Sequence, residues 1–220
     1  MHLTGPALRF FETPRSLMPA RQVKGIVRPA EGLAEMAGSQ NWQWQVEDVI
    51  DAPLERTWAA FEDLSLIPRY HPVVRHVEFA SGASRRAQGV EYKCIVPTGP
   101  RRGWCVEKVV EHVPLRSSTI AFTADSWGLG KLLDDFVTEI AVEPFEGTKT
   151  RVTLRGFYAP VGWRGWLFNA LVIRRTMRKR ARDTVRGLKR LLQAQASPEG
   201  IAAEPAAAPD PAAHGASGSS

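Results

Sequence analysis

A succession of strand-like segments that ends in one long amphipathic helix is the feature that most restricts what this chain can fold into. Between Val73 and Pro160, alternating apolar and polar runs are separated by turn residues, which is typical of antiparallel strands. Gly162–Gln195 then has the periodicity of a helix. One helix covers only part of the concave face of a twisted sheet, and the uncovered part suits a small apolar ligand. The sequence therefore predicts an internal binding cavity.

The expected fold class is α+β, with a curved seven-stranded antiparallel sheet wrapped around the C-terminal helix. The first strand is predicted over Trp42–Ile50. Asp51 is expected to cap a helix that has Pro53 in its first turn and ends near Asp63. A second short helix is expected over Leu64–Tyr70. The remaining strands are predicted over Val73–Ala80, Gln88–Pro97, Gly103–Val113, Ser117–Ala124, Leu132–Glu143 and Thr148–Tyr158.

The composition supports one domain flanked by two tails. The chain has 220 residues, of which 44% are hydrophobic, enough for a sizeable core. Residues 41–195 are expected to form the domain. Residues 1–40 lack periodicity and are expected to be a poorly ordered extension, within which Met36 is a second candidate for the start of translation. Residues 196–220 are rich in Ala and Pro and are expected to be a disordered tail.

Neither membrane insertion nor secretion is predicted by any segment. The chain has no apolar run long enough to span a bilayer, and its N-terminus lacks the features of a secretion signal. Its two cysteines are too few for a disulfide framework. A cytoplasmic location is expected. The formal charge of +6 leaves a peripheral membrane association open.

Several stretches carry a family pattern. VIDAPLERTWAAFEDLSLIPRYHPVVRHVEF (Val49–Phe79) combines a strand end, an Ala-Pro step, a helical Trp and a Tyr-x-Pro step before the next strand. Further matches are Gly89, Val106–Arg116, Gly147–Leu154 and Leu188–Leu192. In these features residues 44–193 resemble the SRPBCC superfamily, also called START-like or Bet v 1-like, which has the helix-grip fold and includes the polyketide cyclase/dehydrase family.

The resemblance implies a cavity for a hydrophobic ligand. Similar proteins include lipid carriers, polyketide cyclases and dehydrases, quinone-binding proteins and oxygenase domains. The chain lacks Rieske-type Cys/His pairs, which disfavours the oxygenase branch. The expected function is binding or transport of a lipid, quinone or polyketide-like molecule, and the alternative is a cyclase or dehydratase. An interaction module with a vestigial cavity is a third interpretation.

The turn between the third and fourth strands predicts which side chains share a face. Gly99 and Pro100 are expected to form a two-residue loop, which pairs Cys94 with Cys105 across the hairpin. The face assigned to the cavity holds Val90, Tyr92, Cys94, Val96, Cys105, Glu107 and Val109. Alternation in the later strands also turns Thr138, Leu154 and Tyr158 inward. A slip of one residue in the turn would invert the hairpin assignment.

Tyr92 and Glu107 are the best candidates for polar chemistry. A carboxylate in an apolar pocket has a raised pKa and serves as a general acid or base, and a tyrosine beside it polarises a carbonyl. The resemblance to the cyclase branch implies aldol cyclisation or dehydration by this pair. Alternatively, Glu107 pairs with a cation and only fixes the strand register. The chain has no phosphate loop, H-E-x-x-H motif or nucleophile elbow, so whether it is an enzyme stays open.

No metal or cofactor is expected. His71 and His76 lack a clear third ligand, so a structural or surface role is favoured for both. Cys94 and Cys105 would lie within disulfide range across the hairpin, and a cytoplasmic location favours two reduced thiols.

One stripe of the long helix is predicted to pack on the sheet. Its members are Trp163, Leu167, Ala170, Met177, Ala181, Val185, Leu188 and Leu192. Arg174 falls within this stripe, where it either reaches past the apolar edge to water or points into the cavity beside Glu107 or an acidic group of the ligand. Ala170, Arg174 and Met177 are the expected ligand contacts of the helix.

The rest of the helix is strongly basic. Its outer cations include Arg175, Arg178, Lys179, Arg182 and Arg186. Such a run is either a solvated face or a surface for anionic lipid headgroups or nucleic acid. Phe168 and Val172 also point outward close to two tryptophans, which favours an anionic membrane over nucleic acid. The oligomeric state is not indicated.

The loop Asp125–Lys131 is a candidate gate. It contains Trp127, Gly128 and Gly130 between two predicted strands, so it is expected to lie at the cavity mouth and to open and close it.

Overall fold

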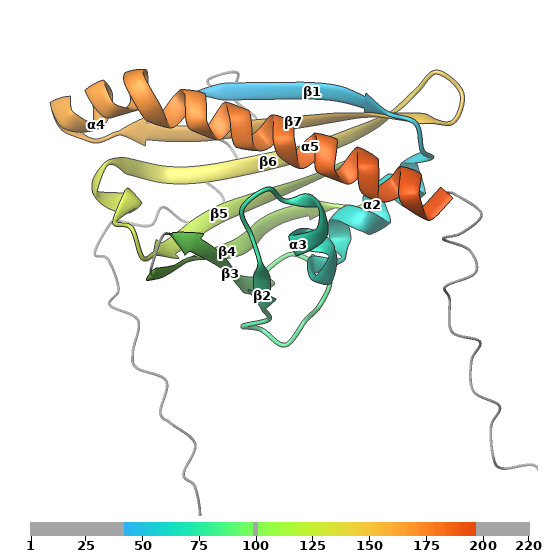
Figure 1. The fold of residues 1–220 in the computed structure, drawn as a ribbon, viewed down its shortest axis with the longest axis horizontal. Helices are drawn as coiled ribbons and strands as arrows, with labels where there is room; N and C mark the ends of the chain where they lie inside the picture. Colours follow the sequence, from blue (N-terminus) through green and yellow to red (C-terminus); the bar gives the residue numbers. More distant parts are fainter. Residues whose placement is uncertain (1–41, 99–100, 197–220) are drawn as a thin grey trace, which may run out of the picture.

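A computed structural model describes residues 42–98 and 101–196 (Figure 1). Both predicted tails, apart from Ala196, lie outside these residues. The described chain forms one antiparallel sheet of seven strands in the order β1-β7-β6-β5-β4-β3-β2. The strands are β1 (Trp44–Ile50), β2 (His76–Glu78), β3 (Glu91–Thr98), β4 (Arg101–Val113), β5 (Ser117–Asp125), β6 (Leu133–Phe145) and β7 (Lys149–Pro160). The predicted α+β architecture is confirmed.

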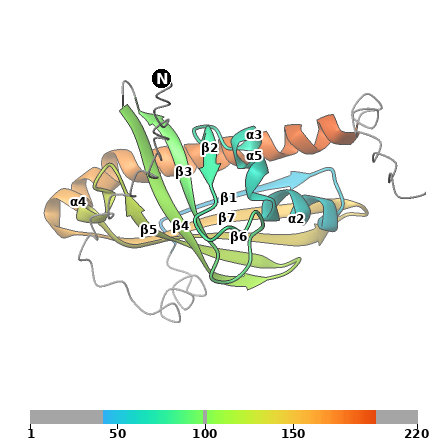
Figure 2. The ribbon, with the colours of Figure 1, turned by 90° about the horizontal axis from the view of Figure 1, so that it is seen from below.

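Short helices separate β1 from β2, and a long helical segment ends the domain. The helical elements are α2 (Leu54–Glu62), η1 (Leu64–Leu66), α3 (Ile67–Tyr70), η2 (Leu129–Lys131), α4 (Gly162–Phe168), η3 (Asn169–Ile173) and α5 (Arg174–Ala196). The segment from α4 to α5 lies along one face of the sheet (Figures 1 and 2). Because β1 pairs with β7, the helices α2 and α3 carry the chain from one edge of the sheet to the other.

The observed pairing of β3 with β4 has the predicted register. Tyr92 pairs with Glu107 and Cys94 pairs with Cys105, although the two turn residues lie outside the described part of the chain. The same face as Cys94 also carries Val96, and both are buried. The pairing of β4 with β5 shifts between Val106 and Glu107, and such an irregularity increases the local bend of a strand. The hairpin therefore curves toward the helix with its apolar face inward.

The second strand is shorter than predicted. It covers only His76–Glu78 instead of Val73–Ala80. The Nδ1 atom of His71 accepts hydrogen bonds from the backbone N–H groups of Val73 and Val74, at 3.4 Å and 3.2 Å. These donors are therefore directed away from a β-ladder, and the strand begins later.

The predicted N-cap at Asp51 is wrong. Helix α2 begins at Leu54, and its N-cap is Pro53, which has an extended backbone and makes no side-chain capping bond. Proline already has a fixed φ near the value that a helix start needs, so the chain turns into the helix two residues later than the Asp would have placed it.

A π turn changes which residues of the long helix face the sheet. The residues that were predicted to pack on the sheet but are exposed are Trp163, Leu167 and Ala170, and Arg174, which falls in the same stripe, is exposed as well. Those buried in their place are Gly165, Asn169 and Ile173. The five residues of η3 form a π-helix, whose wider turn adds a residue relative to an α-helix and so rotates the preceding segment. Beyond η3 the predicted stripe is correct, and Ala181, Val185, Leu188 and Leu192 are all buried.

Helix α5 packs closely on α3 through a glycine. A Cβ atom at Gly187 would overlap the carbonyl oxygen of Tyr70, so only glycine permits this approach. The buried core lies between the concave face of the sheet and this helix, and includes Trp44, Ile50, Leu154 and Val185. The C-terminal half of α5 is thus held firmly against the domain.

Candidate functional site

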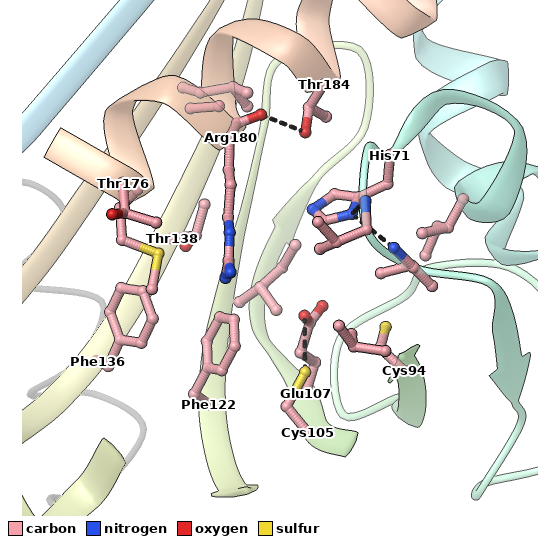
Figure 3. A pocket seen from close by; sticks show the side chains of 18 of the residues that line it. His71, Cys94, Cys105, Glu107, Phe122, Phe136, Thr138, Thr176, Arg180 and Thr184 are labelled. Atoms are coloured by element: carbon pink, nitrogen blue, oxygen red, sulfur yellow. Dashed lines mark hydrogen bonds between the residues drawn. The ribbon is translucent and has the colours of Figure 1, made fainter. Parts of the chain in front are cut away.

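An apolar cavity of about 440 Å³ lies between the sheet and the long helix (Figure 3). Its walls come from β3 to β7, from α3, and from η3 and α5. Two of its aromatic side chains, Phe122 and Phe136, stack with their ring centroids 4.4 Å apart, and Phe136 also meets the edge of the Tyr158 ring at 5.2 Å. A volume of this size suits a small organic ligand.

About half of the predicted cavity residues line this space. The predicted residues in its wall are Cys94, Val96, Cys105, Glu107, Thr138, Leu154, Met177 and, at the loop, Trp127. Those outside the wall are Val90, Tyr92, Val109, Tyr158, Ala170 and Arg174.

Three features of the structure explain why the other predicted residues do not line the cavity. Tyr92 and Val109 are fully buried in the core behind the lining side chains, and Val90 packs against that core at the start of β3. The hydroxyl of Tyr158 donates a 2.8 Å hydrogen bond to Oδ1 of Asn169, which fixes the tyrosine under the helix. Ala170 and Arg174 belong to the helix segment that the π turn rotates outward.

The predicted gate loop is tied to Asp125. Its Oδ1 atom accepts hydrogen bonds from the N–H groups of Trp127 at 2.7 Å and Leu129 at 3.0 Å, and its Oδ2 atom accepts one from Gly130 at 3.4 Å. Gly128 has a φ of 75°, which favours glycine. Trp127 and Leu129 line the cavity, whereas the two glycines do not, and gating by this loop stays a prediction.

A buried polar cluster closes one end of the cavity. Arg86 is 7% exposed, and its Nε and Nη2 atoms donate to the Tyr92 hydroxyl at 3.4 Å and 3.3 Å. Its Nη1 atom donates to the carbonyl oxygen of Phe61. The Tyr70 hydroxyl lies near Arg86 and faces the same space, but it is buried without a hydrogen bond of acceptable geometry to any described residue. Arg86 comes from the loop before β3, and no sequence pattern marked it.

Glu107 lies inside the protein with part of its surface facing the cavity. Burial raises the pKa of its carboxyl group, although the hydrogen bond with Tyr92 and the charge of Arg86 act in the opposite direction. The Cys105 thiol donates to Oε1 of Glu107 at 3.8 Å. The Cys105 contact and burial raise the pKa of the Cys94 thiol, so the neutral thiol is favoured there. Glu107 therefore resembles a general acid more than a fixed charge.

Cys94, Cys105 and Glu107 also have the geometry of a metal-binding group, because their ligand atoms lie within 4.8 Å of one another. Both cysteines are free. The Arg86 charge beside them and the raised pKa of the Cys94 thiol both oppose a cation, since a thiol binds a metal as thiolate. The donor set fits a metal poorly.

Two further cavity residues were not recognised as site residues in the sequence. Burial, together with the charges of Arg180 and Arg86, lowers the pKa of His71 to about 4, so this histidine is neutral at physiological pH. Arg180 lies beside the buried stripe of α5, and its side chain extends into the cavity above Phe122 (Figure 3). The spacing of three residues between Met177 and Arg180 was a signal for this position, because residues three apart lie on the same side of a helix.

The raised pKa of Glu107 predicts how Glu107→Gln affects stability at different pH values. The unfolded chain loses this proton near the ordinary value of 4.5, whereas the native state keeps it to higher pH, so the wild type loses stability as the pH rises above 4.5. Gln is neutral throughout and avoids this loss. Urea unfolding should therefore show the variant gaining stability relative to the wild type between pH 4.5 and the folded-state pKa. Glu91→Gln on the outer face controls for the substitution, and a relative stability that falls with pH would contradict the assignment.

Comparison with known proteins identifies the family. The family described as "Polyketide cyclase / dehydrase and lipid transport" matches residues 42–193, which is more than half of the chain. No curated protein sequence matches.

Solved structures of low sequence identity share the fold. TTHA0849 from Thermus thermophilus has 21% identity and a TM-score of 0.55 over 70% of this chain and 98% of that chain. Ara h 8.0201 has 11% identity and a TM-score of 0.56 over 69% of this chain and 97% of that chain. The Zhui aromatase/cyclase from a Streptomyces species has 12% identity and a TM-score of 0.51, with coverages of 71% and 96%.

The curved sheet around a long C-terminal helix is the helix-grip fold of these structures, and identities this low establish the fold alone. Together with the sequence match over residues 42–193, it shows that the chain belongs to the polyketide cyclase/dehydrase and lipid transport family of the START-like, or Bet v 1-like, SRPBCC superfamily.

Proposed function

We propose that this protein binds a small hydrophobic molecule, such as a lipid, quinone or polyketide-like compound, and carries it without altering it. The observation that supports this most is the cavity of about 440 Å³ enclosed between sheet and helix. Its lining is mainly aliphatic and aromatic, with a smaller number of polar side chains that include Arg86, Glu107 and Arg180. Binding of an apolar ligand in such a cavity is favourable, because it removes the apolar surfaces of the ligand and of the cavity wall from water.

Filling the cavity should remove the bound molecule. Thr138→Trp places a large side chain in the wall, and Thr148→Trp places the same side chain in an exposed turn as a control. In native mass spectrometry of protein purified from its own host, the wild type and the Thr148 variant should carry a small molecule that the Thr138 variant lacks. A wild type that is empty and binds no member of a panel of lipids, quinones and aromatic polyketides would contradict the carrier proposal.

The second candidate is a cyclase or dehydratase that uses Glu107 and Tyr92. The pairing of these residues across the hairpin, and the raised pKa of the Glu107 carboxyl, favour it. Glu107 faces the cavity and, in its protonated form, would donate a proton to a leaving hydroxyl or a carbonyl oxygen. Tyr92 is fully buried and hydrogen-bonded to Arg86, so its role would be to position Glu107 rather than to touch the substrate.

Glu107→Gln separates the two functions. Gln keeps the size and polarity of the side chain but cannot transfer the proton, so an enzyme would lose turnover by about a hundredfold or more. A carrier would keep its ligand affinity, and the molecule would leave the wild-type cavity chemically unchanged. Mass spectrometry of an added polyketide chain before and after incubation with each protein distinguishes these results. Conversion by the wild type that is lost in the variant would establish the enzyme.

We further propose that the protein is cytoplasmic and associates peripherally with anionic membranes, with its cavity mouth against the membrane surface. The π turn leaves a cluster of exposed apolar side chains on α4 and η3, namely Trp163, Trp166, Leu167, Phe168, Leu171 and Val172. Trp163 is 71% exposed and Trp166 is 66% exposed. Phe168 and Val172 also line the cavity, so this cluster surrounds its mouth.

The cations beside the apolar cluster suit anionic headgroups. Three exposed arginines of α5 form no ion pair with any described residue, namely Arg175, Arg178 and Arg182. In contrast, Lys179 and Arg186 both pair with Asp183. Tryptophan at the headgroup level with arginine around it is typical of interfacial helices. Among the helices of residues 42–98 and 101–196, none combines the length and hydrophobicity that crossing a membrane requires.

Vesicle sedimentation tests the docking surface. The protein should bind phosphatidylglycerol-containing vesicles at low salt, bind pure phosphatidylcholine weakly, and be released by high salt. The double variant Trp163→Ser, Trp166→Ser should bind at least about tenfold more weakly, because two large apolar side chains no longer enter the interface. Phe79→Ser, an exposed aromatic of the β2–β3 region, should bind like the wild type. Equal binding by the double variant would contradict this surface.

A further inference from the structure

The arginine, glutamate and histidine side chains of the cavity wall do not balance in charge. The basic ones are Arg86 and Arg180, the acid is Glu107, and His71 is neutral. Two guanidinium groups therefore face at most one carboxylate in an otherwise apolar enclosure. A charge in such surroundings is costly unless an opposite charge or several hydrogen bonds compensate it. The cavity wall thus has a net positive charge, which an anionic ligand would neutralise.

Arg86 and Glu107 are already engaged by the protein. Arg86 donates to Tyr92 and to the backbone carbonyl of Phe61, and Glu107 accepts from Cys105. Arg180 differs from both, because its guanidinium forms no ion pair or hydrogen bond with any residue that the structure describes. Its backbone carbonyl accepts from Thr184, while its side chain crosses the cavity (Figure 3). Arg180 is therefore the cation that a ligand can reach.

A second donor with no described acceptor faces the same space. Tyr70 is 4% exposed, lines the cavity, and has a buried hydroxyl without a hydrogen-bond partner among the described residues. A buried hydroxyl that is left unpaired costs free energy, which a ligand oxygen would remove. Arg180 and Tyr70 come from α5 and α3, which pack directly against each other. Both offer N–H or O–H donors, so they require an acceptor group on the ligand.

From these contacts we infer that the ligand is an apolar molecule with a single carboxylate, which forms an ion pair with the guanidinium of Arg180. This inference rests on the proposed binding function and names the class of its ligand. A carboxylate matches the planar guanidinium fork and carries the one negative charge that the uncommitted cation can balance. A phosphate dianion would require further cations that the wall does not supply. The rest of the ligand lies against Phe122, Phe136 and Leu154.

Calorimetry with matched probes tests the inference. The probes are dodecanoate and anthracene-2-carboxylate, each compared with its neutral carboxamide of the same shape, and no vesicles are present. The wild type should bind at least one carboxylate about ten- to a hundredfold more tightly than its amide. Arg180→Gln should lose this preference while its affinity for the amide changes by less than about twofold. Arg180→Lys should keep part of it, because it retains the charge but not the planar fork.

Arg174→Gln is the matched control. Arg174 is an exposed arginine of the same helix that does not line the cavity, so its variant should keep the full preference for the carboxylate. Equal affinities of the wild type for carboxylate and amide would overturn the inference and leave the binding function intact, and this comparison requires no variant to fold. A preference that survives in Arg180→Gln would also overturn it. If the wild type binds none of the four probes, both the inference and the proposed ligand class fail.

Discussion

The packing of one helix against a sheet that is wider than the helix is the constraint on which the rest of this structure depends. The C-terminal half of α5 is fixed by a backbone contact at Gly187 and by buried side chains such as Val185 and Leu188. The hairpin β3–β4 bends toward the helix, but the side chains on the two sides do not meet everywhere. The residual space is the cavity. Its walls are side chains of the sheet and of the helix that do not reach one another across this space.

The same arrangement explains why charged groups are tolerated in the interior. Arg86 is buried at the closed end, where Tyr92 and a backbone carbonyl share its hydrogen bonds. Glu107 is nearby and keeps its proton more strongly than an exposed glutamate. These groups make one end of an otherwise apolar cavity polar, so the cavity would orient a bound ligand that has one polar end. Orientation of the ligand matters equally to a carrier and to a catalyst.

Much of the fold was predictable from sequence because local patterns dominated there. The Gly-Pro turn specified the β3–β4 register, and alternation identified the inner side chains Cys94 and Cys105. The errors came from interactions that pattern analysis does not contain. The His71 ring redirects two backbone donors and shortens β2, and the π turn rotates the start of the helix.

The site was less predictable than the fold. Glu107, which was predicted to face the cavity, lines it, whereas Tyr92 lies behind the wall. Arg86 lies in a loop without periodicity, and Arg180 lies among arginines that face water. A long flexible side chain can lie on either side of a helix edge, and the sequence carries no record of which side it takes. Only the neighbouring backbone positions decide this, as the opposite placements of Arg174 and Arg180 illustrate.

The π turn between α4 and α5 makes the winding of this helix a determinant of its surface. If Asn169–Ile173 were wound as a regular α-helix with the same residues, α4 would be turned by about 100° relative to α5. Trp163 and Leu167 would then face the sheet, and the exposed apolar cluster would lose these two side chains. A change in winding, with no change in sequence, would therefore reduce the apolar surface that this end of the molecule presents to its surroundings.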